Sequence, residues 1–112
     1  MLPQLDQFNL HHRIAENKSP TVVLFTSGAC SSCRHFKRIL EQVTHRHPEW
    51  LAFEVDAQRD MALTREFEVF HLPAAFLFHR GIFHCELSCE ASVAAVEAAI
   101  TRALQQAPQD AP

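Results

Sequence analysis

The sequence has no excess of positive charge, no long apolar run and no dense set of cysteines. Its net charge is −3 over 112 residues, which provides no basic field for nucleic acid and no polybasic patch for a membrane surface. No apolar stretch approaches the ~18 residues that a membrane span requires. Four cysteines do not make a disulfide scaffold in a chain of this length. We therefore expect neither nucleic-acid nor membrane partners.

The first ten residues, MLPQLDQFNL, lack the basic segment and following apolar stretch of a secretory signal. We therefore expect a cytoplasmic protein. Apolar residues make up 47% of the chain and charged residues 21%, which is ordinary for a soluble globular domain. The length predicts one domain, which we place at residues 1–104, followed by a flexible tail at 105–112 with the sequence QQAPQDAP.

Helical periods and buried apolar runs alternate along the chain, which predicts an α/β domain with a mixed sheet of about four strands flanked by helices. Asp60 and Ser92 are expected to cap the third and fourth helices. Alternation after Gly81 puts Phe83, Cys85 and Leu87 on one face of the last strand. The predicted helices cover residues 5–16, 30–45, 60–67 and 92–104, and the predicted strands cover residues 21–26, 51–55, 74–78 and 82–87.

Two cysteines, in the order Cys30-Ser31-Ser32-Cys33, lie between a predicted strand and a predicted helix. Cβ atoms three residues apart on a helix are ~5–6 Å from each other, and a disulfide needs ~3.5–4.5 Å, so a small adjustment lets this pair open and close. Unpaired N–H groups and the helix dipole favour a thiolate at Cys30. Cys33 begins the apolar face of the helix and suits a shielded resolving thiol. The pattern indicates a redox or metal-binding pair rather than two inert thiols.

At this point the chain resembles the thioredoxin family, from about Phe8 to Leu104. The resemblance rests on the apolar strand Val22–Phe25, on the Cys30–Cys33 motif, and on Val69–Pro73 leading into an apolar strand and then Arg80-Gly81. It implies a three-layer thioredoxin-like fold. It also implies a cis peptide bond between Leu72 and Pro73, facing the cysteine pair.

The same resemblance implies a thiol–disulfide oxidoreductase that works without cofactor or metal and serves cell redox homeostasis. Cys30 would attack a protein disulfide or small oxidant, and Cys33 would resolve the mixed disulfide. The backbone of Leu72, before Pro73, would pair with an extended substrate strand. The implied partners are disulfide-containing proteins and a reductase or other thiol donor.

The residues around the motif depart from the family pattern. Ser31 and Ser32 replace the usual Gly-Pro and are auxiliary candidates, because their hydroxyls can donate to a Cys30 thiolate. Ala29 replaces a tryptophan before the first cysteine, which makes the substrate-binding rim smaller. Cys89 falls at a position that lines the substrate groove, which adds a third thiol to the binding residues.

Another departure concerns the proton of the resolving thiol. The family's buried carboxylate behind that cysteine corresponds to Leu24, and its paired lysine to Ala52, so the acid that helps to deprotonate Cys33 is missing at its usual position. Either another group or water takes the proton from Cys33, or thiol exchange is slow. His35 is near enough in sequence to be an auxiliary candidate.

Two alternatives remain open at this stage. The first is a binding module that keeps the fold and groove but exchanges disulfides inefficiently, which the missing carboxylate and tryptophan favour. The second is a zinc site, since Cys30 and Cys33 form a Cys-x2-Cys pair and Cys85 and Cys89 a Cys-x3-Cys pair. The strand rise of ~3.3 Å per residue makes convergence of the second pair on a helix start awkward, so no metal is expected.

Overall fold

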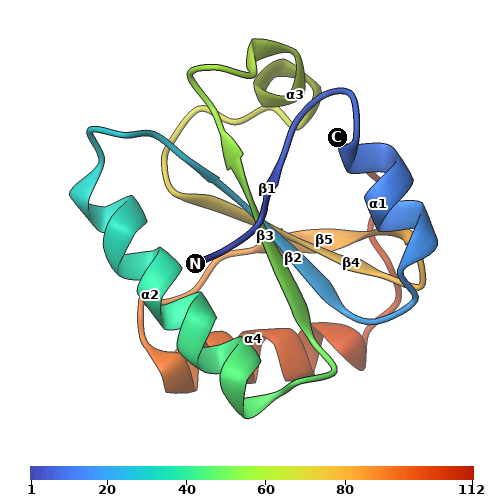
Figure 1. Ribbon diagram of the computed structural model, residues 1–112. Helices are drawn as coiled ribbons and strands as arrows, with labels where there is room; N and C mark the ends of the chain where they lie inside the picture. Colours follow the sequence, from blue (N-terminus) through green and yellow to red (C-terminus); the bar gives the residue numbers. More distant parts are fainter.

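A five-stranded mixed sheet lies between two layers of helices in the computed structural model, which describes residues 1–112 (Figure 1). The strands run in the order β1-β3-β2-β4-β5, with β1, β3 and β2 parallel and β4 and β5 antiparallel to their neighbours. The predicted α/β fold with a mixed sheet is confirmed, with five strands rather than about four. The elements are β1 (Gln4–Leu5), α1 (Leu10–Glu16), β2 (Thr21–Thr26), α2 (Ser31–Arg46), β3 (Leu51–Asp56), α3 (Met61–Glu66), β4 (Ala74–His79), β5 (Ile82–Leu87) and α4 (Val93–Leu104).

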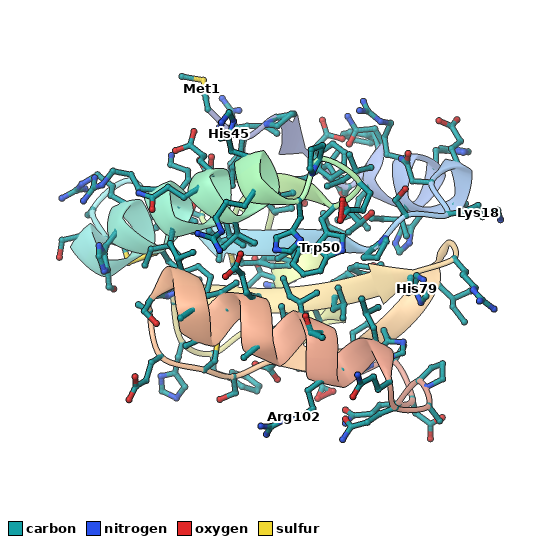
Figure 2. All side chains as sticks on the ribbon, turned by 90° about the horizontal axis from the view of Figure 1, so that it is seen from below. Met1, Lys18, His45, Trp50, His79 and Arg102 are labelled. Carbon is teal, nitrogen blue, oxygen red and sulfur yellow. A yellow bond between two sulfur atoms is a disulfide. The ribbon has the colours of Figure 1, made fainter.

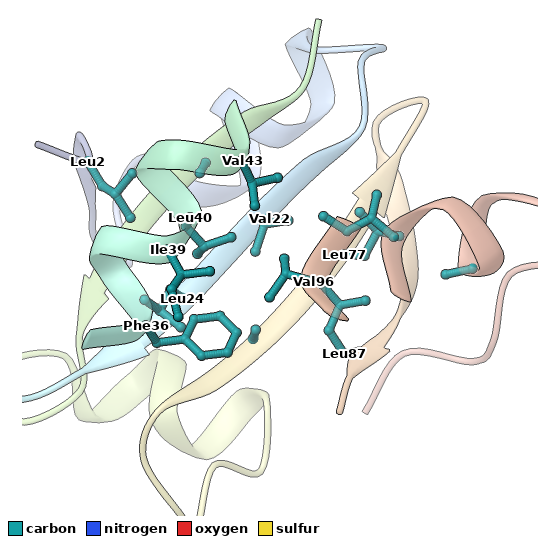
Figure 3. Packing of buried hydrophobic residues seen from close by; sticks show 14 of the residues in the cluster. Leu2, Val22, Leu24, Phe36, Ile39, Leu40, Val43, Leu77, Leu87 and Val96 are labelled. Atoms are coloured by element: carbon teal, nitrogen blue, oxygen red, sulfur yellow. The ribbon is translucent and has the colours of Figure 1, made fainter. Parts of the chain in front are cut away.

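Each face of the sheet has its own apolar core. Helices α2 and α4 cover one face, and α1 and α3 lie on the other (Figure 1). Leu40 of α2, Leu24 of β2 and Val96 of α4 interdigitate in the first core (Figure 3), while a cluster of phenylalanines fills the second. Strands buried on both faces read as continuous apolar runs, as β2 does. No helix of the protein is long and apolar enough to cross a membrane.

The prediction of a helix from residue 5 is wrong. The side chains of Asp6 and Asn9 bond to each other's backbone, with Asp6 Oδ1 accepting from the N–H of Asn9 at 3.1 Å and Asn9 Oδ1 accepting from the N–H of Asp6 at 2.8 Å. These bonds hold residues 6–9 as a turn, so α1 starts at Leu10. Leu5 instead joins the sheet as part of β1, opposite Val55.

The predicted single face for Phe83, Cys85 and Leu87 is also wrong. The register between β4 and β5 shifts at Leu77 and Phe78, so that Phe83 pairs with Phe78 and Cys85 pairs with Leu77. The irregularity inserts one extra residue and reverses the alternation of side chains. Phe83 consequently packs in the phenylalanine core, and Cys85 and Leu87 in the opposite one.

The caps of the helices differ in their use of side chains. Ser92 caps α4 as predicted, with its Oγ accepting from the N–H of Ala95 at 3.1 Å. Asp60 occupies the cap position of α3 but makes no capping bond, because its carboxylate accepts from the N–H of Gln7 at 2.7 Å. Asp60 therefore ties the N-terminal turn to α3 instead of capping the helix.

The last eight residues lie outside the helices and strands and are exposed. One backbone contact joins them to the sheet, because the N–H of Gln109 donates to the carbonyl of His84 at 2.7 Å. His84 itself is buried, and its Nε2 lies 2.5 Å from the carbonyl oxygen of Ala103. The tail thus runs past β5 at the outer edge of the sheet.

Gly81 occupies a backbone conformation that few other residues adopt. Its φ is +82°, and a Cβ built there would lie 3.1 Å from the carbonyl oxygen of Ala15. We expect Gly81→Ala to lower the free energy of unfolding by about 1–2 kcal/mol. Urea denaturation monitored by circular dichroism measures this difference. Gly28→Ala is the matched control, since nothing lies within 4 Å of a Cβ at Gly28, and an equal loss in both variants would contradict the argument.

Polar contacts also join α2 to α4 at one end of the domain. Arg46 Nε and His47 Nε2 lie 2.7 and 2.8 Å from the same Glu97 carboxylate oxygen. The His47 ring stacks on Trp50, with ring centroids 3.9 Å apart. Trp50 and the outward-pointing Arg102 of α4 are labelled in Figure 2. Mainly through the hydrogen bond with His47, and further through Arg46, the pKa of Glu97 is lowered from its ordinary value of 4.5.

This pKa shift predicts a loss of stability in acid. A carboxyl group with a lowered folded-state pKa stabilises the fold above its unfolded pKa, and this contribution is lost as pH falls through the folded value. We therefore expect Glu97→Gln to unfold more readily than the wild type at pH 7 and to show a smaller further loss below pH 4.5. Urea denaturation over a pH series measures both effects. Glu90→Gln, an exposed carboxylate in no ion pair, is the control, and identical pH profiles for wild type and Glu97→Gln would contradict the prediction.

Candidate active site

A disulfide joins Cys30 and Cys33 where β2 leads into α2. Their Cα atoms are 5.2 Å apart. Cys30 is the N-cap residue with extended backbone, and α2 starts at Ser31, so the predicted start at Cys30 differs by one residue. Cys30 is partly exposed, whereas Cys33 is 1% exposed. The pair therefore has an outer sulfur that a partner can reach and an inner sulfur that it cannot.

Hydrogen-bond donors surround the outer sulfur. The backbone N–H of Cys33 donates to Cys30 Sγ at 3.1 Å, and Ser32 Oγ lies 3.3 Å from the same sulfur. The first N–H groups of a helix have no partner within the helix, and they favour negative charge. Arg34 adds a nearby positive charge and donates to the carbonyl of Gly28 at 3.2 Å. After reduction, these groups favour the thiolate form of Cys30.

A groove of about 320 Å³ runs beside the first turn of α2. Ser32, His35, Pro73 and Cys89 all line it, so four of the predicted site residues come together. The Leu72–Pro73 peptide bond is cis. A larger hollow of about 550 Å³ lies under the N-terminal residues, between Met1 and the C-terminal half of α2, but it holds no cysteine. The groove is the cavity that belongs to the disulfide.

The remaining predicted site residues lie around this groove rather than in it. Ala29 and Ser31 are exposed on either side of Cys30. Leu72 is half-buried and packs against the phenylalanine core. Burial raises the pKa of the Cys89 thiol, so this third thiol is less reactive than a free cysteine at neutral pH.

The four cysteines do not meet. Cys30 and Cys33 share a disulfide, while Cys85 and Cys89 are free. Cys85 is buried under α2 and α4, and burial raises its pKa. No group of three or more histidine, cysteine, aspartate or glutamate side chains is placed to hold a metal ion. The geometry does not support the zinc alternative.

A buried carboxylate behind α2 was missed by the sequence analysis. Glu54 of β3 is 6% exposed, and its Oε2 accepts from Thr26 Oγ1 at 2.6 Å. Lys37 Nζ of α2 lies 3.3 and 3.4 Å from the two carboxylate oxygens. Leu24 and Ala52 are apolar and buried, as expected. Glu54 lies directly opposite Leu24 in the register of β2 and β3, so a carboxylate is present one strand away from the position that the family pattern predicts.

The fold and this motif define a class of protein with a redox-active disulfide at a helix N-terminus. The family model described as thioredoxin matches residues 2–102. The chain belongs to the thioredoxin family. A comparison with curated protein sequences gave no match.

Solved structures, among them two thioredoxins, share the fold. The oxidised form of mitochondrial thioredoxin 3 from Saccharomyces cerevisiae matches with a TM-score of 0.79 and 20% identity, over 90% of this chain and 94% of that one. Thioredoxin from Trypanosoma brucei brucei matches with a TM-score of 0.78 and 17% identity, over 95% and 93%. The zinc-bound form of human ERp44 matches with a TM-score of 0.77 and 18% identity over 94% of this chain, but this chain spans only 31% of that protein.

Proposed function

We propose that this protein is a thiol–disulfide oxidoreductase that exchanges the Cys30–Cys33 pair with disulfides of proteins or small molecules. The observation that carries the proposal is the asymmetric pair at the start of α2, with a reachable Cys30 sulfur among hydrogen-bond donors and a buried Cys33 one turn behind it. An asymmetric pair suits two successive steps, attack and resolution. Membership of the thioredoxin family supports the same chemistry.

The reaction in the reducing direction transfers two electrons in two steps. The Cys30 thiolate attacks one sulfur of the target disulfide, a mixed disulfide forms, and the other target sulfur leaves as a thiolate that takes up a proton. The Cys33 thiolate then attacks Cys30 Sγ, which breaks the bond to the target and releases its second thiol. The protein ends as the Cys30–Cys33 disulfide, and a thiol donor or reductase restores the dithiol.

The surroundings of the pair support an extended protein segment as one substrate. The groove beside Ser32, Pro73 and Cys89 is adjacent to the disulfide, and the Leu72 backbone before Pro73 provides a site for strand-like pairing. Ala29 leaves the rim small. The free thiols of Cys85 and Cys89 favour a reducing compartment, so the proposal includes a cytoplasmic location.

Reduction of insulin disulfides with dithiothreitol as electron source tests this function. We expect the protein at micromolar concentration to accelerate insulin precipitation over dithiothreitol alone. Mass spectrometry of the recovered protein should show a Cys30–Cys33 disulfide after turnover without fresh reductant. A rate equal to that of dithiothreitol alone would contradict the proposal.

A further inference from the structure

Cys33 is almost completely shielded from solvent. It is 1% exposed, and its thiol must lose a proton before its sulfur can attack Cys30, because the thiolate is the nucleophile in exchange. Burial in apolar surroundings disfavours that thiolate. A proton acceptor inside the fold would make this step fast. Cys33 has to lose its proton only in the exchange reaction proposed above, so the role inferred for its proton acceptor rests on that proposed function.

Glu54 is the buried acid that contacts α2, the helix that carries Cys33. Its carboxylate bonds to Thr26, the last residue of β2 before the disulfide loop, and to Lys37 of α2. The Lys37 side chain is 31% exposed and the Glu54 side chain 8%. A buried carboxylate is tolerated when it is paired and hydrogen-bonded. This pair connects the interior behind α2 with the surface.

The position of Lys37 relates this pair to the inner sulfur. Lys37 follows Cys33 by four residues on α2, so the two side chains share one face of the helix, a turn apart. Helical side chains lean toward the helix N-terminus, so the Lys37 stem extends back over the turn that contains Cys33. The Glu54 carboxylate, 3.3 Å from Lys37 Nζ, thus lies beneath the face of α2 that carries Cys33.

The sheet register supports the same placement. Glu54 pairs with Leu24 across β2 and β3, and register partners point to the same face of a sheet. Leu24 lines the groove together with Ser32 of the disulfide loop. Neighbouring strands are ~4.8 Å apart, so Glu54 lies one strand spacing from a residue that lines the groove beside the disulfide loop.

We propose that Glu54 is the proton acceptor for the Cys33 thiol in the resolving step. The proton moves from Cys33 Sγ to the Glu54 carboxylate, directly or through one water molecule. The Cys33 sulfur then bonds to Cys30 Sγ, the bond from Cys30 to the target breaks, and the target sulfur leaves with the electron pair. The Lys37 ammonium pairs with the Glu54 carboxylate before the transfer, and the transfer moves one negative charge from Glu54 to Cys33, so the net charge of the interior does not change.

Few other titratable groups face Glu54. On β3 the next side chain on the same face is Asp56, and on α2 the facing charge is Lys37. The residues of β2 on that face are Val22, Leu24 and Thr26, which do not titrate. From the β1 side, the carbonyl of Pro3 accepts from the N–H of Glu54 at 2.9 Å. A change in the resolving step on removal of Glu54 therefore reports on that carboxylate.

Stopped-flow mixing of the reduced protein, in excess, with 5,5′-dithiobis(2-nitrobenzoate) separates the two steps. Attack by Cys30 releases the first coloured thiolate, and resolution by Cys33 releases the second. In Glu54→Gln, which keeps the shape and the bond from Thr26, we expect the first rate to stay within about twofold and the second to fall by about 10²-fold at pH 7. The deficit should shrink as pH rises past ~8.5, where hydroxide takes over proton removal.

Two further variants decide between a proton acceptor and a merely structural residue. Glu54→Asp retains a carboxylate and should recover much of the second rate, whereas Glu41→Gln, which removes a carboxylate of α2 itself, should change neither rate. An unchanged second rate in Glu54→Gln, or a deficit equal at every pH and in Glu54→Asp, would overturn the assignment. Absence of the first phase in the wild-type protein would instead overturn the proposed function, so the two failures are distinguishable.

Discussion

Replacing Cys30 with serine is expected to lower the rate of disulfide reduction by about 10³-fold or more. The hydroxyl of serine is not ionised at neutral pH and cannot form the mixed disulfide, so the first step has no nucleophile. Neither free thiol can substitute for Cys30, because Cys85 is buried in the core under α2 and α4 and burial raises the pKa of both Cys85 and Cys89. Insulin reduction and the first stopped-flow phase both measure the loss.

The controls for this variant come from the other cysteines. Cys85→Ala removes a free thiol from the core and should leave the exchange rate within about twofold while the fold persists. Cys33→Ser should still attack but should accumulate the mixed disulfide, which gel electrophoresis without reductant detects. Full activity in Cys30→Ser would refute the assignment of the nucleophile. A Cys33→Ser variant that traps no partner would favour the binding module with inefficient exchange.

Most of the sheet was predictable because its strands are buried and bounded by turns. The predicted strands agree with β2, β3, β4 and β5 within one residue, since apolar β-branched runs between turn residues leave little choice. β1 was not predictable. It has two residues, which is too few to show any periodicity. It forms because Leu5 pairs with Val55 at the edge of β3. The β4–β5 bulge was equally hidden, because no local residue pattern marks it.

The candidate active site, like the sheet, could be predicted from the sequence only in part. Cys30 and Cys33 could be placed from spacing and context alone, because the chemistry depends on a local feature, the start of a helix. Glu54 could not, since a single glutamate in an alternating run is typical of a solvent-facing position. The reason for its burial appears only in the fold, where β3 is an interior strand between β1 and β2 and helices cover both faces of the sheet (Figure 1). Such a strand has no exposed face, so a carboxylate within it must find buried partners, here Thr26 and Lys37.

The second large effect is expected at Phe25, which is 0% exposed in the phenylalanine core under α1 and α3. Its ring lies 5.7 Å from that of Phe67 and 5.6 Å from that of Phe76, centroid to centroid. Truncation to alanine loses these contacts and leaves a cavity that packed neighbours can fill only in part. We expect Phe25→Ala to lower the free energy of unfolding by about 3–5 kcal/mol, measured by urea denaturation.

The size of this loss matters because small domains are stable by only about 5–15 kcal/mol. Phe8→Ala is the matched control, since that side chain is 80% exposed and its loss should change stability by no more than about 0.5 kcal/mol. A loss below about 1 kcal/mol in Phe25→Ala would mean that the core under α1 and α3 collapses around the gap. Phe25 is also the residue before Thr26, which bonds to Glu54. A folded Phe25→Ala protein should therefore slow the second stopped-flow phase more than the first if the shifted strand end loosens that bond.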